Sequence, residues 1–202
     1  MERCEVLIVG GGPIGLALAL DLAWRGTPPV LVDQGDGTVD HPRAGGISIR
    51  TMEHCRRWGI AHDVRHCGFN LDLPLNQRFC VSVMGFELAI ARYPSIADMP
   101  AAPTSPERLQ RCRQMWFDPI LGAAARKNGA DLRYHQTLES FEQADDGVIC
   151  RIADVKTGAR SEIFAHYMVA CDGATSVVRE MLKISMEGEV LGRSVSILFR
   201  AN

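Results

Sequence analysis

The chain has 202 residues, of which 47% are hydrophobic and 23% charged, and its formal net charge is -2. This composition is that of a globular protein, and the near-neutral charge provides no basic surface for nucleic acid or anionic lipid. The default partner is therefore a small molecule, with no nucleic acid.

The cysteines and histidines show neither a metal pattern nor a disulfide pattern. Seven cysteines are present, none forms a Cys-x-x-Cys pair, and no histidine stands at zinc-finger spacing. We therefore expect no metal site, and a protein of the reducing cytoplasm. The uncharged run from Val6 to Leu20 imitates a signal peptide, but glycines interrupt it and it is shorter than the roughly 20 residues of a membrane span. We expect no membrane span.

The first 33 residues predict a strand, a helix and a second strand. Residues 4–9 and 30–32 are short apolar runs rich in β-branched residues, which is typical of buried parallel strands. Residues 14–25 are apolar on nearly every side, as in a helix packed on a sheet, and Gly26 is placed to end that helix. Together they predict a strand-helix-strand unit.

The middle of the chain predicts an interruption between two helices. Residues 48–58 have helical spacing, whereas residues 79–91 read as short β segments before a Pro- and Ala-rich stretch. We interpret this stretch as an excursion out of the domain that the first strand-helix-strand unit begins. Asp118 as N-cap, with Pro119 at the first helical position, predicts a helix that Asn128-Gly129 ends.

The last third predicts mostly strands. We expect strands at residues 131–135, 138–144 and 148–155, and then a buried strand at 166–171 that runs into Asp172-Gly173. A helix at residues 175–182 and a strand at 190–199 complete the pattern.

The glycine motif between the first strand and the first helix predicts dinucleotide binding. Gly10, Gly12 and Gly15 satisfy G-x-G-x-x-G, with Ile14 in the same loop. Gly10 permits the tight turn, Gly12 lets the backbone approach a pyrophosphate, and Gly15 lets the helix and strand pack closely. The helix N-terminus offers unpaired N–H groups to the phosphates.

Asp33 stands at the end of the second strand, where a carboxylate accepts hydrogen bonds from an adenosine ribose. An acidic group disfavours a 2′-phosphate, so the nucleotide held here is FAD or NAD rather than NADP. A simple turn residue at the end of the strand is the alternative reading of Asp33.

Further motifs make the chain similar to a known family. They are His41-Pro42-Arg43-Ala44 running into Arg50-Thr51-Met52-Glu53, Gln114 ahead of a helix, and the segment from Val169 to Arg179 around Asp172-Gly173. In these motifs the chain resembles the class A flavoprotein monooxygenases, the aromatic-ring hydroxylases related to p-hydroxybenzoate and phenol hydroxylases.

The resemblance implies roles for four residues. Arg43 becomes a contact on the flavin or nicotinamide side, and Gln114 a contact to the flavin portion of FAD. Asp172 and Gly173 serve both FAD and the reducing nicotinamide cofactor, NAD(P)H. Each position also has a structural alternative. Arg43 could be a surface arginine, Gln114 a glutamine that flanks a helix, and Asp172 part of an ordinary turn at the end of a strand. No side chain is assigned as a catalytic acid or base.

Two features depart from the family pattern. Asp33 replaces the more usual glutamate, and the only Gly-Asp dipeptide, Gly35-Asp36, lies far from the place of the family's downstream Gly-Asp segment. Because family members are much longer, we expect this chain to be an N-terminal fragment or a truncated product that is inactive alone.

These observations predict an α/β fold, with a doubly wound, Rossmann-like FAD-binding sheet and pieces of a β-rich substrate domain. We assign residues 1–75 and 105–183 to the FAD-binding domain, 76–104 to a substrate-domain excursion and 184–202 to the start of the substrate domain. The resemblance implies hydroxylation of a small aromatic, phenolic substrate with O2 and NAD(P)H. An FAD-dependent reductase or epoxidase, and a noncatalytic nucleotide-binding remnant, remain alternatives, and the sequence leaves a homodimer open.

Overall fold

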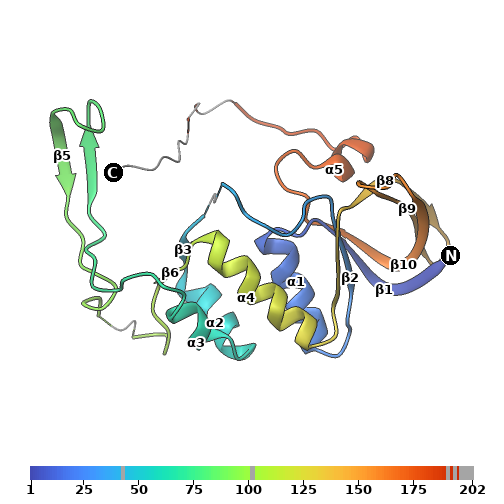
Figure 1. Ribbon diagram of the computed structural model, residues 1–202, viewed down its shortest axis with the longest axis horizontal. Helices are drawn as coiled ribbons and strands as arrows, with labels where there is room; N and C mark the ends of the chain where they lie inside the picture. The colour runs from blue at the N-terminus through green and yellow to red at the C-terminus, as the bar shows by residue number, and fades with distance from the viewer. Residues whose placement is uncertain (42–43, 101–102, 190–191, 193–194, 196–202) are drawn as a thin grey trace. The chain divides into compact units, whose positions relative to one another are not determined.

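The computed structural model describes the chain except for residues 42–43, 101–102, 190–191, 193–194 and 196–202. The chain divides into two compact units (Figure 1). The first unit consists of Met1–Arg43 and Leu121–Asn202, and the second of Ala44–Ile120. The first contains a six-stranded sheet, whereas the second combines short helices with two-stranded sheets.

The second unit is built around a short antiparallel ladder. Strand β3 (Gly46–Ile47) pairs with β6 (Gln110–Arg111), and helices α2 (Ile49–Arg57) and α3 (Ala61–Arg65) follow β3 along the chain. Ser48 caps α2, because its side chain accepts a hydrogen bond from the Thr51 backbone N–H at 3.1 Å. The predicted helix at 48–58 is thus confirmed.

A buried ion pair lies within the second unit. The Glu107 side chain is 3% exposed and accepts a hydrogen bond from Arg65, while Arg56 lies 4.0 Å from its other oxygen. A buried carboxylate needs such partners, because removing its charge from water is expensive.

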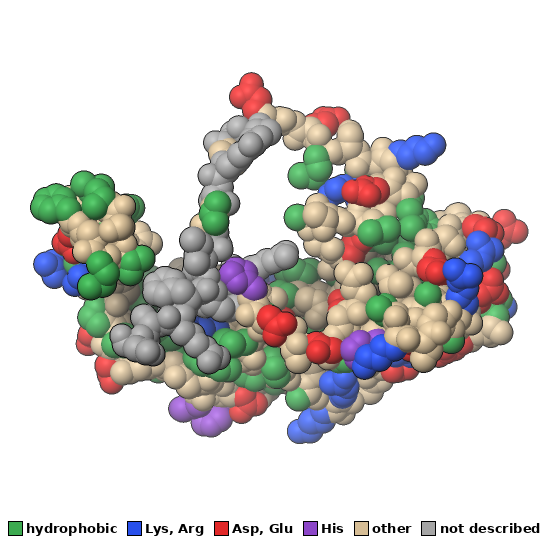
Figure 2. All heavy atoms as spheres, turned by 45° about the horizontal axis from the view of Figure 1, so that its top comes forward, with side chains coloured by type: hydrophobic (Ala, Val, Ile, Leu, Met, Phe, Trp, Pro, Cys, Tyr) green, Lys and Arg blue, Asp and Glu red, His purple; other side chains and the backbone are tan. Residues whose placement is uncertain are grey.

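A β-hairpin projects apolar side chains from the second unit. Strands β4 (Gln77–Cys80) and β5 (Glu87–Ala91) pair antiparallel, in agreement with the short β segments that the sequence predicts. Hydrophobic side chains gather on this hairpin, at the left of Figure 2. Those of Val83, Met84 and Phe86 are 75%, 95% and 76% exposed.

Helix α4 (Gln114–Lys127) corrects one prediction, because it begins a turn earlier than Asp118. The backbone N–H groups of Trp116 and Phe117 both donate to the Arg113 carbonyl, at 2.8 and 2.9 Å. Pro119 therefore lies inside the helix. The Asp118 carboxylate does not cap the helix, because it accepts a hydrogen bond from the Gln114 side chain one turn earlier, at 3.1 Å.

The sheet of the first unit has parallel and antiparallel parts. The four strands β7, β2, β1 and β10 are parallel neighbours, whereas β9 and β8 continue the sheet antiparallel. The fold class is therefore α/β, as predicted. In sheet order the strands are β7 (Asp131–Tyr134), β2 (Val30–Asp33), β1 (Glu2–Val9), β10 (Arg160–Ala170), β9 (Gly147–Asp154) and β8 (Gln136–Ala144).

Helix α1 (Pro13–Trp24) covers one face of this sheet. It packs against β1 and β2, and its apolar side chains, including Leu16 and Leu20, are buried. Successive side chains of a strand point to opposite faces. Ile8, which is fully buried, therefore points away from the side of the sheet that Leu7 and Val9 occupy.

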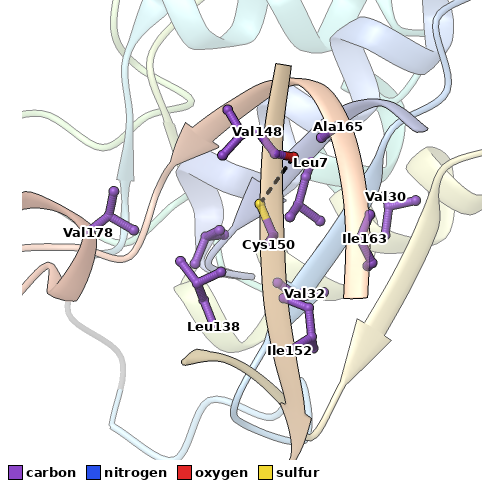
Figure 3. Close-up of a cluster of buried hydrophobic side chains, with 11 residues drawn as sticks. Leu7, Val30, Val32, Leu138, Val148, Cys150, Ile152, Ile163, Ala165 and Val178 are labelled. Atoms are coloured by element: carbon purple, nitrogen blue, oxygen red, sulfur yellow. Dashed lines mark hydrogen bonds between the residues drawn. The ribbon is translucent and has the colours of Figure 1, made fainter. Parts of the chain in front are cut away.

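The opposite face of β1 and β2 is closed by the antiparallel strands (Figure 3). Strand β8 contacts β2, so the sheet curls over itself and encloses an apolar core. Each fully buried aliphatic side chain of this core contributes roughly 1.5–3 kcal/mol. The cluster comprises Leu7, Val9, Val30, Val32, Leu138, Val148, Cys150, Ile152, Ile163, Ala165 and Val178.

Strand β10 corrects a second prediction. The sequence predicts a buried strand at 166–171, but His166 and Tyr167 are exposed, Tyr167 at 69%. The reason lies in the pairing: β9 accompanies β10 only to Ala165, whereas β1 accompanies it to Ala170. Beyond Ala165 one side of the strand is thus uncovered.

The remaining predictions concern the C-terminal part. Helix α5 (Val177–Met181) confirms the predicted helix at 175–182 in shorter form. The strand expected at 190–199 falls largely outside the described residues.

Candidate dinucleotide-binding site

The glycine turn lies where three parallel strands end. The Gly10 backbone N–H donates to the Val32 carbonyl of β2 at 2.9 Å, and the Cys171 N–H, just after β10, donates to Val9 at 2.7 Å. Gly10 has a φ of +109°, and a Cβ there would collide with the Cys171 carbonyl. Only glycine fits this turn.

Gly12 and Gly15 have different surroundings. Gly15 sits in the first turn of α1, where a Cβ would collide with the Gly10 carbonyl, so helix and strand are in close contact. Gly12 is the N-cap residue, and a Cβ there would meet nothing within 4 Å. The space beside Gly12 is therefore open to a ligand.

The N-terminus of α1 is suited to an anion. Its N-cap residue, Gly12, has no side chain that could cap the helix, and residues 13–16 of the first turn are not acidic. The unpaired N–H groups and the positive end of the helix dipole are therefore left to a ligand. Ile14, in the same turn, is 70% exposed.

Asp33 is anchored by the backbone on both sides. Its Oδ2 accepts a hydrogen bond from the Gly11 N–H at 2.6 Å, and its Oδ1 accepts one from the Gly35 N–H at 2.8 Å. A carboxylate can accept about four hydrogen bonds. The two backbone contacts therefore orient the group and leave acceptor capacity for the hydroxyls of a ribose.

Asp172 has a structural role that the sequence reasoning missed. Its Oδ1 accepts from the Ser176 hydroxyl at 2.6 Å, and its Oδ2 accepts from the Val178 N–H at 3.2 Å. The carboxylate thus ties the segment after β10 to the start of α5. Gly173 follows with a φ of +84° and is exposed.

A pocket of about 210 Å³ lies in the first unit, beside the glycine turn. Gly10, Asp33 and Asp172 line it together, so three positions that the sequence singled out converge. Gln136 and Thr137, at the start of β8, also line it. Sequence reasoning missed these two, because no motif marks them and only the curled sheet brings β8 to this place.

The pocket and the adjacent N-terminus of α1 together have groups that suit parts of a dinucleotide such as FAD. The space beside Gly12 is wide enough for a phosphate to approach the backbone, and the Asp33 carboxylate has acceptor capacity of the kind that a ribose requires. Gln136 also lines the pocket, and its buried Oε1 has no hydrogen-bond partner among the described residues, so this acceptor is left unsatisfied there.

Gln114, at the start of α4, belongs to the second unit. Its backbone N–H donates to the Ala44 carbonyl at 3.1 Å, and its half-buried side chain donates to Asp118. Burial raises the pKa of Asp118 to about 6, because the charged carboxylate loses water. Arg43 lies outside the described residues.

Comparisons with known proteins identify the family. The sequence profile of the family described as "FAD binding domain" matches residues 3–202. The chain belongs to this family. It is 37% identical, over its whole length, to a tetracenomycin B2 monooxygenase-dioxygenase from Streptomyces olivaceus, and 35% identical, over 98% of its length, to an aklavinone 12-hydroxylase from Streptomyces peucetius.

The solved structures agree with the sequence relatives. A flavin-dependent monooxygenase, PieE, in complex with FAD and substrate, superposes with a TM-score of 0.81 at 35% identity, covering 93% of this chain and 33% of that one. The matched part of the two sequence relatives is 40% and 41% of their length. The chain thus spans about two fifths of the length of these two curated relatives.

Two further findings concern the described part of the chain. None of its helices is both long and apolar enough to cross a membrane. Within the same residues, no group of three or more His, Cys, Asp or Glu side chains is arranged to hold a metal ion.

Proposed function

We propose that the chain is the FAD-binding part of a monooxygenase that hydroxylates an aromatic, phenolic substrate with O2 and NAD(P)H. The observation that carries the proposal is the convergence of Gly10, Asp33 and Asp172 on one pocket beside the open N-terminus of α1, in a chain of the FAD binding domain family. The tetracenomycin and aklavinone relatives are a monooxygenase-dioxygenase and a hydroxylase, which favours hydroxylation over the reductase and epoxidase alternatives.

Each residue of the site receives a role under this proposal. Gly10, Gly12 and Gly15 form the cradle of the pyrophosphate, with Ile14 in the same turn, and the α1 N–H groups bind its oxygens. Asp33 accepts hydrogen bonds from the adenosine ribose.

The remaining proposed contacts lie toward the flavin ring. Gln114 and Arg43 contact the flavin side, while Asp172 and Gly173 contact FAD and the nicotinamide reductant. Asp118 holds the amide of Gln114 in a fixed orientation, because an ionised carboxylate can only accept from the NH2 group.

Bound FAD would supply the redox and oxygen chemistry, which protein side chains cannot provide. The chain binds and orients the cofactor and keeps water away from the reacting atoms.

We further assign residues 1–75 and 105–183 to the FAD-binding domain and residues 76–104 and 184–202 to the substrate domain.

We also place the protein in the cytoplasm. All seven cysteines lie in the described part of the chain, and all seven are free thiols, which suits a reducing compartment. Light scattering on the purified protein tests whether it forms a homodimer.

The experiment uses the full product of the gene that encodes this chain. It is purified, loaded with FAD and given NADH or NADPH with a panel of phenols and naphthols under 18O2. We expect the phenol to accelerate NAD(P)H oxidation and one 18O atom to appear in the hydroxylated product. NAD(P)H oxidation without labelled product would favour the reductase alternative, and bound flavin that neither nucleotide reduces would favour the noncatalytic one.

A further inference from the structure

A second pocket, of about 330 Å³, lies within the second unit beside the β3–β6 ladder. Its apolar wall is formed by Phe69, Pro74 and Leu75. A pocket of this size is at the lower end of the range that holds a small organic ligand. Phe69 offers an aromatic surface against which a flat ring can pack.

The polar side of this pocket is positively charged. Arg111 and Arg113 line it together with the carboxamides of Asn76 and Gln77, and none of its described lining residues is acidic. Arg111 Nε is buried and has no hydrogen-bond partner within the described chain. A buried N–H without an acceptor is costly, and a guanidinium is best satisfied by a carboxylate or another oxygen anion.

The arginines of the second unit differ in whether they form ion pairs. Arg65 binds the buried Glu107 and Arg50 pairs with Glu53 at 2.9 Å, so these charges are matched within the protein. Neither Arg111 nor Arg113 forms an ion pair with any described residue; Arg113 lies 5.5 Å from the centre of the Trp116 ring. Two guanidinium groups without an ion-pair partner among the described residues therefore lie together at this pocket.

The pocket adjoins the segments to which we assign flavin contacts. Gly45 and Arg113 line the pocket. Ala44 precedes Gly45 and Gln114 follows Arg113, and the Gln114 N–H donates to the Ala44 carbonyl at 3.1 Å. The Cys112 N–H donates to the Gly45 carbonyl at 3.0 Å and holds the two segments together. A ligand in this pocket would lie beside Gln114.

We propose that this pocket binds the acidic group of the aromatic substrate, a carboxylate or phenolate, through Arg111 and Arg113, with the ring against Phe69 and Leu75. The proposal rests on the proposed function, since it names the substrate class of that enzyme. It adds that the substrate is an anion, and that Arg111 and Arg113 determine this preference.

The test compares two ligands of the same shape and different charge, 2-naphthoate and 2-naphthamide, by isothermal titration calorimetry. We expect the wild-type protein to bind the naphthoate at least tenfold more tightly than the amide. Arg111→Gln should reduce this preference to nearly onefold, and Arg111→Lys should retain part of it, because a lysine keeps the charge but loses the planar donor pair. Arg108→Gln is the matched control, since Arg108 is exposed in the same unit and does not line the pocket.

Arg113→Gln provides a second variant at an exposed position that should fold even if Arg111→Gln does not. It should also lower the preference for naphthoate, with an unchanged thermal midpoint. Equal binding of the two ligands to wild type would overturn the proposal, as would a preference that both glutamine variants leave intact.

Titrations of FAD and NADH with the same variants separate this proposal from the function itself. We expect Arg111→Gln and Arg113→Gln to leave both dissociation constants within twofold. If instead NADH binding weakens and naphthoate binding does not, the pocket serves the dinucleotide and the substrate assignment is wrong. If wild type binds no FAD but retains the charge preference, the proposed function fails while the anion site stands.

Discussion

At the scale of single residues, two carboxylates show how position decides chemical behaviour. Asp33 is partly exposed, lines the pocket and accepts hydrogen bonds from two backbone N–H groups, which fix the orientation of its carboxylate. Asp118 is 4% exposed, and among the described residues its Oδ1 has no partner. The first carboxylate is arranged to bind a ligand, whereas the second is destabilised in its charged form.

Replacing Asp33 should weaken cofactor binding. Asp33→Ala removes the acceptor that we propose for the ribose, so we expect FAD affinity to fall by about 1.5–3 kcal/mol, which is roughly ten- to a hundred-fold in the dissociation constant. A fluorescence titration of FAD measures it. Asp36→Ala is the matched control, because Asp36 lies in the same loop and its carboxylate accepts hydrogen bonds from Thr38, without lining the pocket. Equal losses in both variants would show that the loop, and not the ribose contact, is at fault.

Asp118 should make stability depend on pH. Burial raises its pKa from 3.8 to about 6 in the folded protein, so the folded state binds the proton more tightly than the unfolded state. Its contribution to stability is therefore fully present below about pH 4 and is lost as the pH rises through about 6. Asp118→Asn keeps an acceptor for Gln114 but cannot ionise.

We expect Asp118→Asn to raise the free energy of unfolding by about 1–3 kcal/mol at pH 8, and to have little effect at pH 4. Urea unfolding at several pH values measures the difference. Asp63→Asn, at an exposed position of α3, serves as the control. A stability gain for Asp118→Asn that is constant from pH 4 to pH 8 would contradict the burial argument.

At the scale of elements, two glycines of the turn between β1 and α1 are needed for different reasons. Gly15 allows the helix to contact the turn, whereas Gly12 faces open space. One glycine is thus needed for packing, and the other for access of a ligand.

Substitutions at these two positions should therefore separate folding from binding. Gly15→Ala inserts a methyl group against the Gly10 carbonyl, and we expect it to lower the free energy of unfolding by about 1–3 kcal/mol. Gly12→Val should abolish FAD binding while the circular dichroism spectrum and thermal midpoint stay close to wild type. A Gly12→Val protein that retains full FAD affinity would reduce the motif to a structural turn.

At the scale of the whole molecule, the described surface is uneven in polarity. Much of the exposed apolar surface of the second unit lies on the β4–β5 hairpin, at Phe79, Val83, Met84, Phe86 and Leu88. A concentrated apolar patch on a hairpin favours association.

We expect the double substitution Val83→Ser and Phe86→Ser to reduce concentration-dependent association, as measured by light scattering, without lowering the thermal midpoint. Both side chains are at least 75% exposed, so their removal costs little packing. Val155→Ser, at an isolated exposed position in the first unit, is the control. Association that persists unchanged in the double variant would point to another surface.

The sequence by itself determined the strand-helix-strand unit, the positions of Gly10 and Asp33 at the ends of their strands, and the α/β class. It could do so because those signals are local: β-branched runs, a glycine turn and a helix follow one another within 33 residues. Only the tertiary structure decided that Gln136 and Thr137 line the pocket, because strand pairing over more than 100 residues brings β8 to β2. It also decided that Asp118 is buried within α4 and that His166 and Tyr167 of β10 are exposed, since helix starts and strand burial depend on which neighbours are present. The pocket at Arg111 and Arg113 has the same origin, because the β3–β6 ladder brings Gly45 close to Arg111, which is 66 positions later in the chain.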